Sequence, residues 1–150
     1  MAPLLEELDL GENPILIPSL VQVFPQISAL RKLGLNRTNL GDREVLVLAS
    51  HLRLIPHLKS LHLANNSIEN NGMETLAVAL STLDNFLHLD VSNNHITDFN
   101  LGVLSDLNLD VFVLDDNPIS TTCKRILHDM FGPIIEDDVY EDVPLPPLQN

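Results

Sequence analysis

The segment Leu58-Lys59-Ser60-Leu61-His62-Leu63-Ala64-Asn65-Asn66-Ser67-Ile68 decides the fold, because its pattern occurs five times in the 150 residues of the chain. The pattern holds an aliphatic or aromatic residue at its first, fourth and sixth positions, Asn or Thr at its ninth, and Leu or Ile at its eleventh. The other four copies span 5–15, 30–40, 86–96 and 109–119. The first residues of the five copies are separated by 25, 28, 28 and 23 positions, so the chain is an array of short repeats.

Each copy predicts a short strand whose side chains alternate between two faces. In the copy quoted above, alternation sends Leu61 and Leu63 to one side of the strand and His62 to the other. We therefore expect the inward residues of successive repeats to stack into one continuous core.

A polar residue follows each strand at the point where the chain turns away. Because an amide carries both donors and an acceptor, it can bond backbone groups of its own and the neighbouring turn that would otherwise be buried and unpaired. Thr38, in the second copy, can replace only part of this bonding. We predict a structural ladder formed by Asn13, Asn66, Asn94 and Asn117.

Between the strands, the apolar residues change to a helical period. Met73, Leu76 and Leu80 lie on one face of a helix, with the small Ala77 beside them. The fourth connector belongs to the 23-residue repeat and has room for only about one helical turn.

The pattern resembles the leucine-rich repeat, from about Leu5 to Ile119. A 28-residue unit with a Gly-x-x-x-Leu-Ala-x-x-Leu run, here Gly72 to Leu80, is similar to the ribonuclease-inhibitor type of this repeat. The resemblance implies an α/β fold, a curved right-handed solenoid of strands and helices with about five repeats. It also implies that the outward strand positions form a concave surface.

The array is expected to end on a capping helix. Ser120 and Thr121 are residue types that begin helices, and Gly132-Pro133 ends one. Between them, an apolar stripe can cover the last turn of the solenoid: Cys123, Ile126, Leu127, Met130 and Phe131. We therefore divide the chain into a repeat array over 1–119, a capping helix over 120–132 and an acidic, proline-rich tail over 133–150.

The other end of the chain is expected to be open. A complete repeat begins by Leu5, and nothing before it can cap an exposed edge strand. We expect the chain to be the C-terminal part of a longer array, and self-association through this edge is a further expectation. The alternative is a naturally short protein whose first turn frays or pairs with a partner.

Composition excludes several classes of function. With 8 Lys and Arg against 21 Asp and Glu, the formal charge is −13, which disfavours binding to nucleic acid or to an anionic membrane. The single Cys123 excludes an internal disulfide and a cysteine-rich zinc site. The sequence contains neither a long apolar run nor a signal peptide, so we expect an intracellular, cytoplasmic protein.

The outward strand positions and the turns behind them are the candidate binding surface. They run from acidic through basic and histidine-containing to apolar, and a banded surface of this kind suits a protein partner with a basic or mixed-charge surface. The alternative is that solvated strands carry charges without a function. The predicted partner-binding residues are Glu7, Asp9, Lys32, Arg37, Lys59, His62, His88, Asp90, Val111 and Val113.

His62 and Asp90 occupy the same position in neighbouring repeats, so a His–Asp contact is geometrically allowed. A catalytic site would also need a nucleophile with an oxyanion hole, and a metal site would need a third strong ligand. The pattern supplies neither, so we expect no enzyme activity, no metal and no cofactor.

The sequence therefore predicts a non-catalytic module that binds a protein partner. Proteins with this repeat include cytosolic inhibitors, innate immune receptors, actin-capping proteins and activators of the small GTPase Ran, and the fold does not choose among them. Two alternatives remain, a GTPase-activating protein of the Ran-activator type and a structural scaffold segment.

Overall fold

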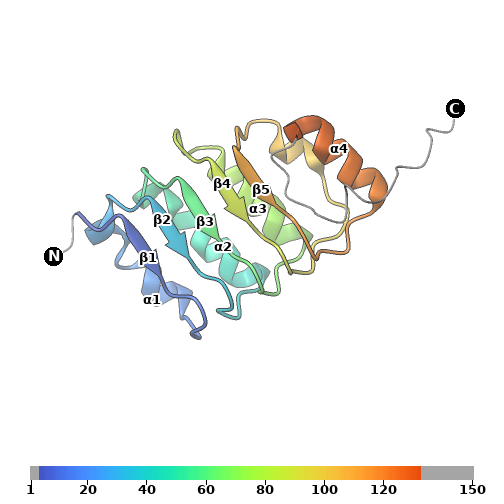
Figure 1. The fold of residues 1–150 in the computed structure, drawn as a ribbon. Coiled ribbons are helices and arrows are strands. Elements are labelled where there is room, and N and C mark those ends of the chain that lie inside the picture. The colour runs from blue at the N-terminus through green and yellow to red at the C-terminus, as the bar shows by residue number, and fades with distance from the viewer. Residues whose placement is uncertain (1–3, 133–150) are drawn as a thin grey trace, which may run out of the picture.

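The computed structural model describes residues 4–132, and in them each Leu-x-Leu segment forms a short parallel strand. The strands stand side by side in chain order (Figure 1). Leu33, Leu61 and Leu89 lie directly opposite one another in register, as alternation requires. The predicted α/β repeat solenoid is confirmed. The strands are β1 (Glu7–Asp9), β2 (Lys32–Gly34), β3 (Ser60–His62), β4 (His88–Asp90) and β5 (Val111–Val113).

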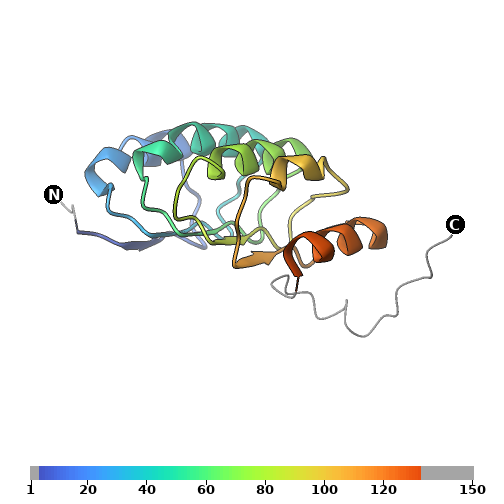
Figure 2. The same cartoon turned by 90° about the horizontal axis from the view of Figure 1, so that it is seen from above.

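Helical connectors form a second layer on one side of the sheet (Figure 2). The 28-residue repeats contain full helices, whereas the 23-residue repeat contains a single 3-10 turn, η3 (Leu101–Leu104). The other connectors are α1 (Ile17–Val21) with η1 (Phe24–Ile27), α2 (Asp42–His51) with η2 (Leu52–Leu54), and α3 (Asn70–Leu80).

The core lies between the strands and these connectors. The inward residues of the four central and C-terminal strands, Leu33, Leu61, Leu89 and Phe112, have no exposed surface. Met73, Leu76 and Leu80 of α3 are equally buried. Burying each of these side chains contributes about 1.5–3 kcal/mol, so the stacked layers supply the main stabilisation.

The ladder asparagines join successive turns. The buried Asn94 donates to the carbonyls of Leu63 and Val91, both at 2.9 Å, and accepts from the Ile68 N–H at 3.0 Å. Leu63 and Ile68 belong to the preceding repeat. Asn66 and Asn117 are buried and bonded in the same way.

The first two repeats depart from this ladder. The Thr38 hydroxyl reaches only the carbonyl of Leu35, in its own turn, at 2.7 Å. Asn13 is exposed and donates only to the carbonyls of Leu10 and Gly11, at 3.2 and 2.9 Å. Asn13 is therefore a surface residue of the first turn, unlike the buried members of the predicted ladder.

Gly72 allows α3 to approach α2. A Cβ at this position would lie 2.3 Å from the Asp42 Oδ1 atom, which accepts the N–H of Glu69 at 2.7 Å. Since Asp42 begins α2 and Glu69 precedes α3, any larger residue would disturb the bond that links the two helix starts.

The helix α4 (Thr121–Phe131) begins with a side-chain cap. The Ser120 hydroxyl accepts the N–H of Cys123 at 3.1 Å. Ser120 also donates its hydroxyl and its N–H to the carboxylate of Asp98, at 2.6 and 2.8 Å, which lowers the pKa of Asp98. These bonds attach α4 to the preceding repeat.

The packing of α4 uses one side of the predicted apolar stripe. Cys123 and Leu127 are buried, and the Phe131 ring meets the edge of Phe112 at a centroid distance of 5.4 Å. Ile126 and Met130 instead remain 45% and 41% exposed, because only one face of α4 meets the array. The helix lies beside β5, at the level of the strand layer (Figure 2). The tail predicted over 133–150 lies outside the described residues.

Replacing Asn94 by Ala should lower the free energy of unfolding by about 1–3 kcal/mol, because buried groups of Leu63, Val91 and Ile68 lose their partner. Urea denaturation followed by circular dichroism measures this loss. The matched control is Asn93→Gly at the next, exposed position, where φ is 51° and glycine is unstrained. A loss in the control as large as in Asn94→Ala would contradict the assigned role of the ladder.

Candidate functional site

The outward side chains of the five strands form one continuous surface, which we call the strand face. The helices α1, α2 and α3 lie on the opposite side of the sheet (Figure 2). Glu7, Asp9 and Lys32 are exposed, and the others are half-buried. Besides these three, the strand face contains Ser60, His62, His88, Asp90, Val111 and Val113.

The first two strands place an acidic band next to a basic side chain. Glu7 lies opposite Lys32 in the register of β1 and β2. The Asp9 carboxylate accepts the Gly11 N–H at 2.9 Å and lies against Gly34, where a Cβ would be only 2.7 Å from Asp9 Oδ1. Glycine is therefore required at position 34, and Lys32 is the one side chain that β2 adds to the strand face.

Two histidines occupy the centre of the strand face. The rings of His62 and His88 lie 4.8 Å apart, centroid to centroid, and the Ser60 hydroxyl is 2.8 Å from His62 Nε2. Burial lowers the pKa of His62 below its ordinary value, and the positive charges of His88 and Lys32 lower it further, against the opposite effect of Asp90 and Asp9. Because its pKa lies below 6.5, the His62 imidazole is neutral at pH 7.

The His–Asp contact that the sequence allowed, between His62 and Asp90, does not form. His62 and Asp90 are register partners in β3 and β4, but the His62 ring packs on His88. Asp90 Oδ1 instead accepts the N–H of Ser92 at 2.9 Å, within its own turn. Among residues 4–132, no group of three or more His, Cys, Asp or Glu side chains is arranged to hold a metal ion. This arrangement offers contacts and hydrogen bonds to a partner.

The last strand ends the strand face with an apolar band. Val111 and Val113 of β5 are half-buried, and α4 lies beside this strand (Figure 1). Since both neighbours of these valines on β4, His88 and Asp90, are polar, the character of the surface changes sharply between β4 and β5.

The structure also shows a left-handed backbone conformation, in the turns that follow the strands, that the sequence prediction did not identify. Just after each strand, one residue has a positive φ, between 51° and 65°, and the second repeat has a further such residue at Asn39, with φ of 61°. Asn and Asp tolerate this left-handed conformation better than other non-glycine residues, so the Asn-Asn and Asp-Asn pairs before the ladder positions were the available signal. This left-handed row contains Glu12, Arg37, Asn65, Asn93 and Asp116.

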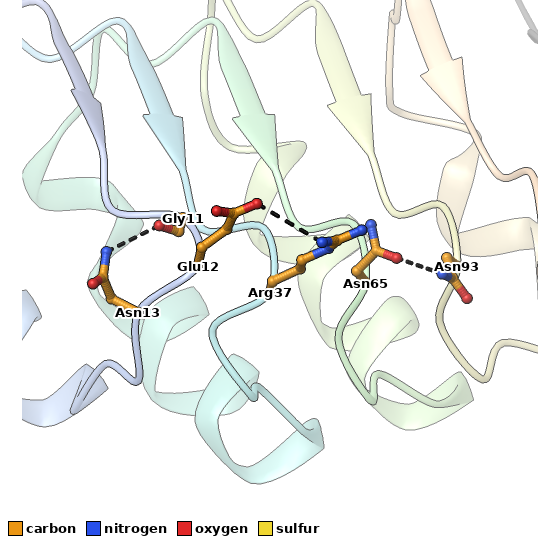
Figure 3. Close-up of polar contacts among 6 residues, drawn as sticks. All are labelled: Gly11, Glu12, Asn13, Arg37, Asn65 and Asn93. Atoms are coloured by element: carbon orange, nitrogen blue, oxygen red, sulfur yellow. Dashed lines mark hydrogen bonds and ion pairs between the residues drawn. The ribbon is translucent and has the colours of Figure 1, made fainter.

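Neighbours in the left-handed row interact along the array (Figure 3). Arg37 Nη1 lies 3.8 Å from Glu12 Oε1, and the Asn93 amide donates to the Asn65 carbonyl oxygen. The Glu12–Arg37 pair is well exposed, so it contributes little to stability, about 0–1 kcal/mol. The row borders the strand face at the carboxyl ends of the strands.

The three basic residues among the predicted partner-binding residues lie in three different places. Lys32 lies on β2, whereas Arg37 belongs to the left-handed row and is paired with Glu12. Lys59 precedes β3 and is exposed in the turn, where its carbonyl accepts from Leu87 and His88. Lys32 therefore projects from a strand, whereas Arg37 and Lys59 lie in the segments that flank the strands.

In the described part of the chain, 4–132, no helix combines the length and the hydropathy needed to cross a membrane.

A comparison with protein families identifies the repeat. The family model described as "Leucine Rich repeat" matches residues 55–77 and 85–98. No curated protein matches the sequence significantly.

Two solved structures share the fold at low sequence identity. The C-terminal domain of Caenorhabditis elegans tropomodulin is 14% identical, with a TM-score of 0.63 over 85% of this chain and 82% of that one. Actin-binding site 2 of leiomodin-1 is also 14% identical, with a TM-score of 0.61 over 86% and 80% of the two chains. A leucine-rich repeat protein of Leptospira interrogans is 23% identical, with a TM-score of 0.46 over 87% and 42%. The ribonuclease-inhibitor subtype stays a prediction.

Acidification below about pH 7 should destabilise the fold through His62, because the unfolded chain takes up a proton near the ordinary pKa of 6.5 while the folded chain resists it. This loss is absent at higher pH, where His62 is neutral in both states. His62→Gln should therefore show a shallower decline in the free energy of unfolding than the wild type between pH 7.5 and about 5.5, measured by urea denaturation. The control is His57→Gln, at an exposed position outside the strands, which should keep the wild-type decline. Identical declines in the wild type and His62→Gln would contradict the assignment.

Proposed function

Since the chain is a leucine-rich repeat protein, we propose that it is a non-catalytic interaction module that binds a protein partner on its strand face. The observation that carries this proposal is the strand face itself, a continuous surface opposite the helices whose outward residues change from strand to strand while the inward residues repeat. The repeated inward residues keep the fold constant, and the varied outward residues give each strand a different chemistry with which to recognise a partner.

The chemistry of the strand face indicates the kind of partner. Acidic side chains on β1, a lysine on β2, histidines on β3 and β4, and valines on β5 form successive bands. A partner must match these bands in order, which favours a folded protein surface over a small molecule. The net charge of −13 adds a long-range preference for a partner with a basic or mixed-charge surface. We place this binding in the cytoplasm.

Actin is a defined partner to test first. The support is the likeness in fold to the leiomodin-1 segment described as an actin-binding site. At 14% identity this likeness transfers no binding residue to the chain. Cosedimentation with actin filaments tests the candidate directly, with a charge-reversed strand face (Lys32→Glu) as the comparison.

The two alternatives, a GTPase-activating protein and a scaffold segment, are separated from partner binding by their readouts. A GTPase activator accelerates GTP hydrolysis by its GTPase, whereas a passive module binds without changing turnover. A scaffold segment binds nothing on its strand face. A crosslinking group placed on β5 of a scaffold segment would therefore capture no more protein than one placed on α2.

A photo-crosslinker identifies the partner and its location in one experiment. We suggest a benzoylphenylalanine at Val111, at the edge of the apolar band, and a matched one at the 56%-exposed Leu46 on α2. Specific capture from position 111 but not from position 46 supports binding on the strand face. Capture from position 46 alone would overturn the proposal.

With the partner purified, Lys32→Glu should slow association by about tenfold at low salt and much less at high salt, because charges at an interface act mainly on encounter. Surface plasmon resonance at two ionic strengths measures the change. The matched control is Arg43→Glu, an equal charge reversal at an exposed position on α2, which should leave association unchanged. Equal effects of both variants would show that total charge, and not the strand face, steers binding.

A further inference from the structure

A hollow lies between the connector that follows α3 and the connector that follows η3, just before the strands β4 and β5 begin. Residues within 80–87 and 106–108 line it, and we call it the connector hollow. Its volume is about 250 Å³, below the roughly 300–1,000 Å³ of sites that enclose a small molecule. This size suits one or two side chains of a partner protein. No residue of the strand face lines the connector hollow, so the two surfaces are separate.

The connector hollow coincides with a change in the spacing of the repeats. Ile27, Ile55 and Leu83 are each buried three positions before the next copy of the repeat pattern. In the shorter fourth connector, the buried Leu107 comes only two positions before Leu109, where the last copy begins. The third and fourth connectors therefore do not stack as like on like, and the hollow lies between them.

The floor of the connector hollow is apolar. Leu83, Phe86 and Leu107 line it and belong to the buried core. Beside them, Leu87 keeps 36% of its surface exposed. In the other four copies of the pattern, the residue at this position is charged and exposed: Glu6, Arg31, Lys59 and Asp110. An exposed leucine beside an apolar floor, where every other copy is charged, indicates a contact with an apolar group of a partner.

The rim of the connector hollow is acidic. Asp84 and Asp106, one from each connector, line the hollow and are exposed, and among residues 4–132 neither forms an ion pair. The sequence contains no Lys or Arg between Lys59 and Lys124, so the neighbouring repeats supply no cation to neutralise them. The helix α3 ends at the hollow without a basic residue in its last turn, and the partial negative charge of its C-terminus adds to the two carboxylates.

This charge selects the occupant. Residues 133–150 contain five acidic residues and no basic one, so their charge does not complement the rim. A second copy of the chain carries the same net charge of −13, which opposes self-association. A basic segment of a different protein complements the hollow.

From the apolar floor, the acidic rim and the size, we propose that the connector hollow binds a segment of a partner protein in which an Arg or Lys stands next to an aliphatic residue. The aliphatic residue contacts Leu87 and the floor. The stem of the basic side chain lies along the same apolar surface, and its charged group reaches the carboxylates of Asp84 and Asp106.

The probe for this proposal is the synthetic peptide acetyl-Ser-Leu-Arg-Leu-Ser-amide, which places one arginine between two leucines. The comparison peptide carries citrulline in place of arginine, because citrulline keeps the shape of the side chain and lacks its charge. Binding is followed by the amide chemical shifts of the full 150-residue chain on titration with each peptide.

We expect the arginine peptide to shift the amides of Asp84, Leu87 and Asn108. The citrulline peptide should bind about fivefold more weakly, and the difference should shrink at high salt. A variant with both Asp84→Asn and Asp106→Asn should bind the two peptides equally, because it keeps the shape of the rim and removes its charge. The matched control is Asp129→Asn, at an exposed position on α4, which should keep the preference for arginine.

Four outcomes would overturn the proposal. Equal binding of the two peptides to the wild type would remove the role of the aspartates, and absence of binding would remove the site. Shifts at Glu7 and Asp9 without shifts at Leu87 would assign the peptide to the strand face, which would support the proposed function and not this one. Concentration-dependent association of the chain alone, lost in the double variant, would make the occupant a second copy.

Discussion

The side-chain amide that follows each strand is the interaction on which the array depends. Strands of three residues leave most of each turn outside the sheet, so many buried backbone groups there have no sheet partner. Asn66 and Asn94 satisfy such groups in two successive turns from one buried position. The third, fourth and fifth repeats are thereby each bonded to the repeat before them, and a buried polar group that would otherwise be costly links the layers.

Because of this arrangement, the outward strand residues contribute little to the stability of the fold. The inward leucines and the ladder amides stabilise the fold, so the strand face can change from acidic to basic to apolar without changing the architecture. Gly34 is the exception, since the Asp9 carboxylate lies over it and excludes any larger side chain. The inward residues of each strand therefore stabilise the fold, and the outward residues are left to form the proposed binding surface.

The ends of the array show what happens where the ladder stops. Asn13, with no turn before it among residues 4–132, bonds only within its own turn and is exposed. At the other end, Ser120 joins α4 to Asp98, and Phe131 covers Phe112. Among the described residues, the last repeat is therefore covered by a helix that is bonded and packed against it.

The sequence by itself determined the repeats, the strands, their order and most of the buried positions. A periodic pattern repeats the same local geometry, and only stacking of like on like buries the inward leucines of the central repeats. The tertiary structure alone decided the contacts between neighbouring repeats. It placed the His62 ring on His88 and not on its register partner Asp90, and it paired Arg37 with Glu12. It also exposed Ile126 and Met130 on α4. Such features depend on turn conformation, on side-chain rotamers and on which face of an element meets its neighbour, and the spacing of residues along the chain does not encode these.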